Sequence, residues 1–114
     1  MFFKNTSETI AFGKDFVKNL KPKSIILLKG PIGAGKTSFV KGIGQGLCIK
    51  ESITSPTFSL SNHYGSGSMH LIHMDLYRID NSLSARELFI EEEEELETTN
   101  GLLIIEWPLS LIHI

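Results

Sequence analysis

The chain has 114 residues, 41% of them hydrophobic and 21% charged, and its formal net charge is −2. This composition is that of an ordinary globular protein, and the near balance of charge argues against a surface that coats nucleic acid. Cys48 is the single cysteine, which excludes an intramolecular disulfide and a cysteine-based metal cluster. The first ten residues do not resemble a secretory signal, and no segment reaches the ~18 apolar residues that a membrane span needs. The sequence therefore predicts a soluble cytoplasmic protein of one domain, residues 1–114.

The first half of the chain predicts a helix, a strand and a second helix. Apolar residues fall on one helical face over 7–20, and Ser7 is a suitable N-cap. The run Ser24–Lys29 is apolar without alternation, which is typical of a central strand covered on both faces. A second helix is predicted from Lys36 to Leu47, although its glycines weaken it.

The second half predicts three further strands and one more helix. A short strand is expected around Thr57–Leu60, and a longer one in Met69–Ile79 that ends near Asp75. A helix over Ser82–Glu97 and a strong strand in Gly101–Pro108 follow. Strands separated by helices predict an α/β fold, a three-layer P-loop NTPase-like sheet with parallel strands flanked by helices.

The segment Gly30–Thr37, "GPIGAGKT", satisfies the pattern G-x-x-x-x-G-K-[ST] directly after a predicted strand and at the start of a predicted helix. Its glycines let backbone N–H groups turn inward, and the helix N-terminus adds a favourable field for phosphate. Lys36 would reach the β and γ phosphates, and the hydroxyl of Thr37 would bind Mg²⁺. A turn that binds nothing has no need of Lys and Thr there. The expected phosphate-binding residues are Gly33, Ala34, Gly35, Lys36, Thr37 and Ser38.

Two carboxylates end hydrophobic strands and compete for the role of the acid that holds the metal. Asp75 closes "LIHMD" and Glu106 closes "LLIIE". One would hold Mg²⁺ with Thr37 while the other orients the attacking water, and the sequence leaves the assignment open. The expected catalytic residues are thus Lys36, Asp75 and Glu106. The alternative for each acid is a solvent-exposed strand end or a helix cap.

Other polar groups carry weaker signals. The guanine-reading Asn-Lys-x-Asp and the D-x-x-G switch are both absent, which favours ATP over GTP. His70 and His73 stand three residues apart on a strand, so they point to opposite faces and are better explained as histidines satisfied by their neighbours. The run Glu91–Glu95 predicts a solvated helix face, with an acidic docking surface as the alternative.

Four motifs together resemble one family: "GPIGAGKTSF", "SPTF" at 55–58, "HMDLYR" at 73–78 and "IEWP" at 105–108. In this order and at these spacings they are similar to the TsaE ATPases of bacterial tRNA threonylcarbamoyladenosine synthesis. The similarity runs from about Thr6 to Pro108 and is far more specific than a P-loop alone.

This resemblance implies a P-loop ATPase that works with the TsaD and TsaB proteins, and so with tRNA indirectly. Hydrolysis would support turnover of that complex. By the same resemblance Asp75 is the Walker-B-like acid and Glu106 a second metal-site or water-directing acid. Trp107 lies beside the site, Thr57 belongs to a γ-phosphate-sensing switch, and Thr6 lies near the adenine.

The sequence departs from the family in stopping at Leu109–Ile114, where members continue with a further strand pair. We expect either a shortened member or a degraded gene product that keeps the motifs. The alternative function is a nucleotide-gated binding module that has lost hydrolysis. A small-molecule kinase ranks lower, because Arg78 and Arg86 are the only arginines and no lid-length insertion is visible.

Overall fold

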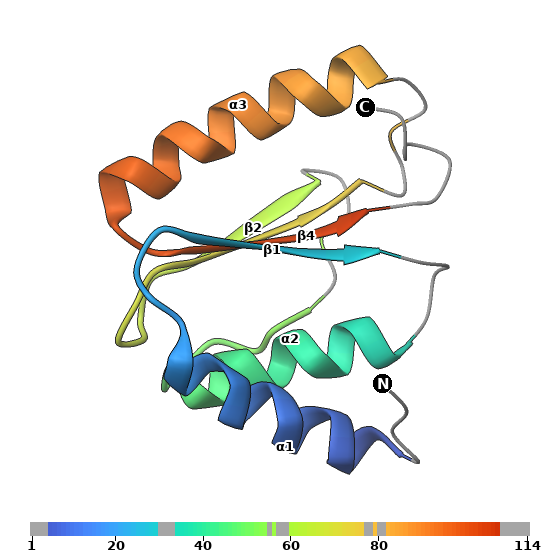
Figure 1. Ribbon diagram of the computed structural model, residues 1–114, viewed down its shortest axis with the longest axis vertical. Helices are drawn as coiled ribbons and strands as arrows, with labels where there is room; N and C mark the ends of the chain where they lie inside the picture. The colour runs from blue at the N-terminus through green and yellow to red at the C-terminus, as the bar shows by residue number, and fades with distance from the viewer. Residues whose placement is uncertain are drawn as a thin grey trace.

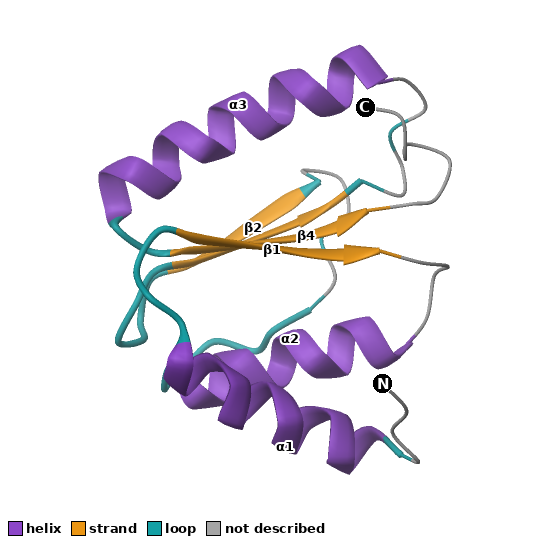
Figure 2. Ribbon diagram, viewed as in Figure 1, coloured by secondary structure: helices purple, strands orange, loops and turns teal. Residues whose placement is uncertain are grey.

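The computed structural model describes residues 5–29, 34–54, 56, 60–76, 79 and 82–107. A four-stranded sheet lies between two helical layers, with α1 and α2 on one face and α3 on the other (Figures 1 and 2). The elements in chain order are α1 (Thr6–Phe16), the 3₁₀ helix η1 (Val17–Asn19), β1 (Ser24–Lys29), α2 (Ala34–Gly46), β2 (Ser61–Tyr64), β3 (Leu71–Asp75), α3 (Ser82–Thr99) and β4 (Leu102–Trp107).

The strand order in the sheet is β1-β4-β3-β2. β4 pairs in parallel with both β1 and β3, while β2 pairs antiparallel with β3. Parallel neighbours joined through helices are the pattern that the sequence predicts, and the three-layer α/β expectation is confirmed. All three parallel strands consequently end at the same edge of the sheet (Figure 1).

Two hydrophobic clusters fill the space on either side of the sheet. The cluster toward α1 and α2 joins Val40 and Ile43 of α2 to Leu71 and Ile104 of the strands. The cluster toward α3 consists of Ile72, Met74, Leu76, Ile79, Ala85, Leu96, Leu103 and Ile105. Because side chains alternate along a strand, the residues of β3 and β4 divide cleanly between the two faces.

α1 and α2 approach closely because Gly42 has no side chain. A Cβ at Gly42 would collide with the backbone carbonyl of Ile10. Farther along, Gly46 of α2 lies against the backbone of Lys14, so the two helices run in the same direction. The glycines that weaken α2 as an isolated helix therefore stabilise its packing in the protein.

The N-cap of α1 is Asn5, and the expectation of Ser7 was wrong. Asn5 is extended, and its side-chain oxygen accepts a hydrogen bond from the backbone N–H of Glu8 at 2.9 Å. The hydroxyl of Thr9 also donates to the Asn5 carbonyl at 3.2 Å. Asn5 is thus the residue that satisfies a donor left free at the helix start.

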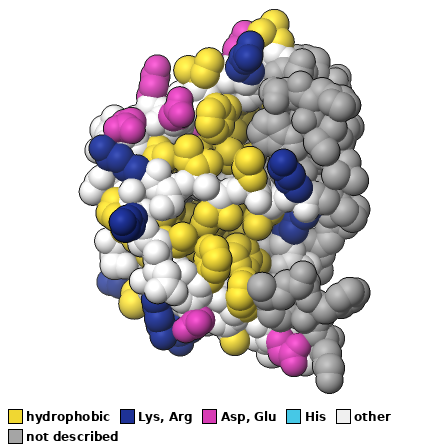
Figure 3. All heavy atoms as spheres, viewed as in Figure 1, with side chains coloured by type: hydrophobic (Ala, Val, Ile, Leu, Met, Phe, Trp, Pro, Cys, Tyr) yellow, Lys and Arg dark blue, Asp and Glu magenta, His cyan; other side chains and the backbone are white. Residues whose placement is uncertain are grey.

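β1 has the expected bounds but not the expected burial. Within the described sheet it is an edge strand, and its residues alternate between half-buried and exposed. Ile25 and Leu27 are 41% and 46% exposed, because the hydrophobic cluster toward α3 is built from β3 and β4 and includes neither residue. Apolar side chains consequently reach the surface on this side of the molecule (Figure 3). The strands buried on both faces are β3 and β4.

The other boundaries differ by a few residues. Of the strand expected around Thr57–Leu60, residues 57–59 lie outside the described residues. The strand observed next is the polar β2, which the sequence pattern does not predict. β3 begins at Leu71, two residues later than expected, and α3 continues past Glu97. Polar composition hides β2, because Tyr64 is the only buried residue in this strand.

Candidate functional site

The first turn of α2 carries the Lys-Thr pair of the glycine-rich motif. Gly35, Lys36 and Thr37 lie in this turn, directly after the segment that leaves β1, and residues 30–33, including Gly33, lie outside the described residues. The turn contains no acidic side chain. Its backbone N–H groups and the helix dipole therefore make this helix start electropositive, and the described first turn adds no negative charge of its own.

Gly35 leaves open space at this helix start. A Cβ added there would meet no atom of the described residues within 4 Å, in contrast with Gly42 farther along the same helix. Packing within the described protein therefore does not require a glycine at position 35. A phosphate that approaches the backbone of a helix N-terminus does require such space. Of the flanking residues, Lys36 and Thr37 are half-buried and Ser38 is buried.

The two strand-end acids lie side by side. Asp75 is paired in register with Glu106 across β3 and β4, and Glu106 is in turn paired with Leu28 of β1. Leu28 packs in the cluster on the α2 face, so alternation places both acids on that face as well. The strands end at the edge of the sheet from which the chain passes to α2 (Figure 1). The acids and the helix start therefore share one end of the molecule.

Glu106 has a buried partner that the sequence did not identify. Nε2 of His73 lies 2.7 Å from Oε2 of Glu106, with His73 fully buried and Glu106 5% exposed. The interpretation of His73 as a histidine satisfied by its neighbours holds for Nε2 only, since Nδ1 is buried without a partner among the described residues, and the partner of Nε2 is a candidate site residue. The available signal was the spacing of His73 and Asp75, which places both on one face of β3.

The remaining expected residues are placed in part. Thr6 is the exposed first residue of α1, and the parallel packing of α1 and α2 puts it at the end where α2 begins. Trp107 is the last residue of β4, opposite Lys29 of β1. Ala34 begins α2. Thr57 lies outside the described residues.

A second group of polar side chains lies on the α3 face. Nε2 of His63 donates to Glu92 at 2.6 Å, and Nδ1 of His63 lies 3.2 Å from Nε2 of His70. Glu92 is only 7% exposed, so the expectation of a uniformly solvated run Glu91–Glu95 was wrong at this position. Desolvation, followed by repulsion from His63, lowers the pKa of His70. Among the described residues no group of three potential ligands is arranged to hold a metal ion.

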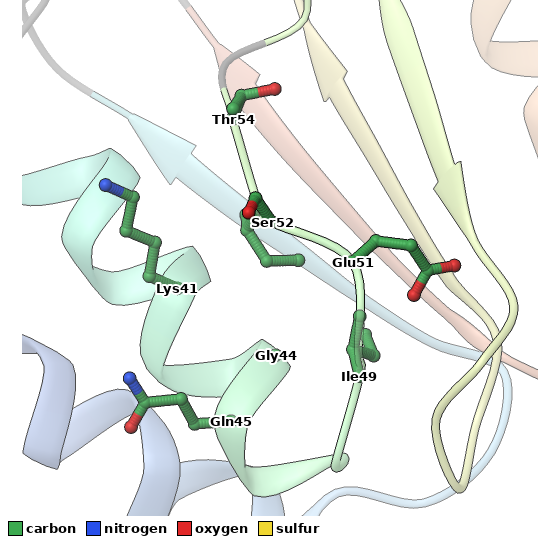
Figure 4. A pocket seen from close by; sticks show the side chains of 8 residues that line it. Lys41, Gly44, Gln45, Ile49, Glu51, Ser52 and Thr54 are labelled. Atoms are coloured by element: carbon green, nitrogen blue, oxygen red, sulfur yellow. The ribbon is translucent and has the colours of Figure 1, made fainter.

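A shallow pocket of about 370 Å³ lies between the later turns of α2 and the segment 49–54 (Figure 4). Its charged groups do not converge, because Lys41 and Glu51 point in opposite directions (Figure 4). The carboxylate of Glu51 instead accepts a hydrogen bond from the hydroxyl of Ser66, which lowers the pKa of Glu51. Its lining contains none of the residues that the sequence predicts for the nucleotide site.

The chain is similar to one protein family over nearly its whole length. Residues 3–113 match the family model of "Threonylcarbamoyl adenosine biosynthesis protein TsaE". The tRNA threonylcarbamoyladenosine biosynthesis protein TsaE of Synechocystis is 42% identical over 108 residues, which are 94% of this chain and 68% of that protein. The protein of the same name from Bacillus subtilis is 36% identical, over 90% of this chain and 62% of its own.

A solved structure has the same fold. The crystal structure of Bacillus subtilis YdiB superposes with a TM-score of 0.70 at 32% identity, covering 96% of this chain and 64% of that one. The chain thus spans about two thirds of the length of these relatives. Among the described helices, none combines the length and apolar character that crossing a membrane demands.

Proposed function

Because this chain belongs to the TsaE family of threonylcarbamoyladenosine biosynthesis proteins, we propose that it binds and hydrolyses Mg-ATP in support of tRNA threonylcarbamoylation. The observation that carries the proposal is the open helix start at Gly35 beside the paired acids Asp75 and Glu106. An electropositive cradle next to carboxylates is what a nucleotide triphosphate and its metal require. On this proposal, residues 1–114 act as one P-loop ATPase domain.

The start of α2 would bind the phosphates. Backbone N–H groups from Gly33 to Ser38 would donate to the phosphate oxygens, with Ala34 and Gly35 at the closest approach of the backbone. The ammonium of Lys36 would neutralise the β and γ phosphates. The open space at Gly35 supports this arrangement, because a side chain there would occupy the volume that a phosphate needs.

The hydroxyl of Thr37 and the carboxylates of Asp75 and Glu106 would serve the metal and the attacking water. Hard oxygen donors of this kind are the ligands that Mg²⁺ prefers. When bound, Mg²⁺ spreads the negative charge that develops on the transferred phosphoryl group. The parallel register of β3 and β4 supports the proposal because it sets both carboxylates side by side on the α2 face.

Three further residues complete the proposed nucleotide site. Thr6 would lie near the adenine, which its place at the start of α1 supports. Trp107 would flank the site from the end of β4. Thr57 would sense the γ-phosphate in the loop between α2 and β2. Their substitution is expected to weaken nucleotide binding less than loss of Lys36, since none of them neutralises a phosphate charge.

The partners of the reaction would be the TsaD and TsaB proteins, with tRNA engaged indirectly in the cytoplasm. The TsaE relatives are named for tRNA threonylcarbamoyladenosine biosynthesis, which supports a role in that modification. Hydrolysis would change the conformation of the protein, and the partners would respond to that change. ATP turnover should accordingly rise when the partner proteins are added.

Single-turnover hydrolysis of ATP tests this proposal. Wild type should release phosphate, and Lys36→Ala should reduce the rate at least about tenfold through loss of a charge-assisted contact. Lys41→Ala is the matched control, because Lys41 is an exposed lysine on the same helix. Nucleotide binding without any phosphate release, alone or with the partner proteins, would favour a nucleotide-gated binding module instead.

A further inference from the structure

We infer that His73 is a positioning residue of the nucleotide site, which holds the carboxylate of Glu106 in one fixed orientation. The inference rests on the proposed function and deepens it. It assigns a role to a residue that would act through another, without contact to the nucleotide. The feature that carries it is the buried pair of His73 on β3 and Glu106 on β4.

The pair is buried on the face of the sheet that α2 covers. His73 is fully buried, its side chain opposite Ile104 of β4 in the parallel register. From there the ring reaches Glu106, two residues farther along β4, at 2.7 Å. The backbone of Glu106 is also held, because its carbonyl accepts a hydrogen bond from the N–H of Leu76 at 3.1 Å. The side chain of Glu106 is therefore held by β3, and its backbone by the residue directly after β3.

The hydrogen-bond inventory identifies the tautomer. A carboxylate only accepts, so Nε2 of His73 carries the hydrogen that Oε2 of Glu106 receives. Nδ1 is buried and has no partner among the described residues. A ring with a hydrogen on Nε2 and none on Nδ1 leaves only a lone pair unsatisfied, which costs less than a buried, unpaired N–H. His73 thus donates a single directed hydrogen bond.

Packing alone does not account for this pair. Leu71 and Ile104 on the same face show that apolar side chains fill this part of the core. Replacing a buried polar pair by apolar residues is often neutral or stabilising, so the pair is weak support for stability. The His73–Glu106 pair instead fits a positioning role: the hydrogen bond from His73 holds one carboxylate oxygen of Glu106, so that the other oxygen stays directed at the site. Carboxylates in metal sites are held in this way by neighbouring donors.

This geometry distinguishes the two acids. Asp75 is half-buried at the end of β3, whereas Glu106 is almost wholly enclosed and committed to His73 through Oε2. We therefore assign the fixed, water-directing role to Glu106 and the more accessible metal-facing role to Asp75. Loss of His73 should disturb turnover more than nucleotide affinity.

Three variants test the inference: His73→Leu, which removes the donor; His73→Gln, which keeps an N–H at a similar reach; and Ile104→Val, which trims the residue opposite His73. Under single turnover, His73→Leu should lower the maximal rate about 10- to 100-fold, the range for loss of a group that orients a metal-site ligand. Its affinity for Mg-ADP should change less than threefold. His73→Gln should recover most of the rate, and Ile104→Val should change neither quantity.

A spectroscopic readout requires no nucleotide. In the free protein, imidazole ¹H–¹⁵N spectra should show an Nε2–H of His73 that is protected from exchange, and Glu106→Ala should abolish the protection. A rapidly exchanging or Nδ1-protonated ring would overturn the inference. So would His73→Leu hydrolysing ATP at the wild-type rate, or a rate loss that His73→Gln does not recover. Absence of hydrolysis by wild type would instead contradict the proposed function, and the spectra would still decide the inference.

Discussion

Asp75 and Glu106 lie directly opposite each other at the ends of β3 and β4, both on the face covered by α2. Their environments differ, since Asp75 is half-buried and Glu106 is buried against His73. Two neighbouring carboxylates in unlike surroundings are suited to separate tasks. The first prediction follows from this difference between the two acids.

Asp75→Asn and Glu106→Gln should fail in different ways. Asp75→Asn removes the charge offered to Mg²⁺, so the Mg²⁺ concentration that gives half-maximal ATP binding should rise by about 10- to 100-fold. Glu106→Gln should bind Mg-ATP within threefold of wild type but lose at least about 100-fold in single-turnover rate. Calorimetry and rapid quench measure the two quantities. Identical profiles for the two variants would contradict the division of roles.

Gly35→Ala should separate stability from binding. Because a Cβ at Gly35 meets no atom of the described part of the chain within 4 Å, the free energy of unfolding should be unchanged or higher by up to about 1 kcal/mol. Affinity for ATP should nevertheless fall, since the new methyl group lies where the phosphates would approach. Urea unfolding and calorimetry on the same samples measure both effects.

Gly42→Ala is the matched control for that experiment. There the Cβ collides with the backbone carbonyl of Ile10, so α1 and α2 must move apart. Overpacking of this kind costs typically about 1–3 kcal/mol. The free energy of unfolding should fall accordingly. If Gly35→Ala destabilised the protein as much as Gly42→Ala, the space at the start of α2 would not be open.

Asn5→Ala should destabilise α1 through loss of its cap. The Asn5 side chain accepts the hydrogen bond from Glu8, and removal of such a cap costs about 0.5–2 kcal/mol. Ser7→Ala, at the exposed position that the sequence suggested as the cap, should change the free energy of unfolding by less than about 0.5 kcal/mol. Paired urea titrations compare the two. Equal losses would place the cap elsewhere.

Stability should fall as the solution is acidified below about pH 6.5, partly through His70. Burial and His63 lower the pKa of His70 from its usual 6.5, so the unfolded chain binds a proton more readily than the folded protein. The stabilisation is present above pH 6.5 and is lost as pH falls from there to the lowered pKa. Nearby Glu92 and Glu95 oppose the shift. Between pH 5 and 8, the free energy of unfolding should vary less with pH in His70→Gln than in wild type. An unchanged pH dependence would contradict this origin.

The local features of the site were predictable from the sequence. Gly30–Thr37 is a contiguous motif, so its position between β1 and α2 follows from the order of neighbouring elements. Asp75 and Glu106 each follow an apolar run, and parallel strands bring such ends together. The three-layer architecture follows from the same alternation of strands and helices. In each case the sequence signal is local: a contiguous motif, an apolar run that ends in an acid, or the order of neighbouring elements.

Features that depend on distant partners were not predictable in this way. Ser24–Lys29 has the composition of a central strand, yet its place at the edge of the described sheet depends on which strands pair with β4. His73 and Glu106 are separated by 33 positions, and the hydrogen bond between them depends on the register of β3 and β4. Glu92 lies in an acidic run, which predicts a solvent-exposed side chain. It is instead hydrogen-bonded to His63 of β2. Pairing and register decide these outcomes, and neither is encoded in a short pattern.

A calorimetric titration of this 114-residue chain with ATP, in the presence and absence of Mg²⁺, decides whether the start of α2 is a nucleotide site. We expect saturable binding at one site, tighter with Mg²⁺, and weakened at least about tenfold in Lys36→Ala but unchanged in Lys41→Ala. Absence of binding, or equal affinity in wild type and Lys36→Ala, would contradict the assignment of a nucleotide site to the start of α2.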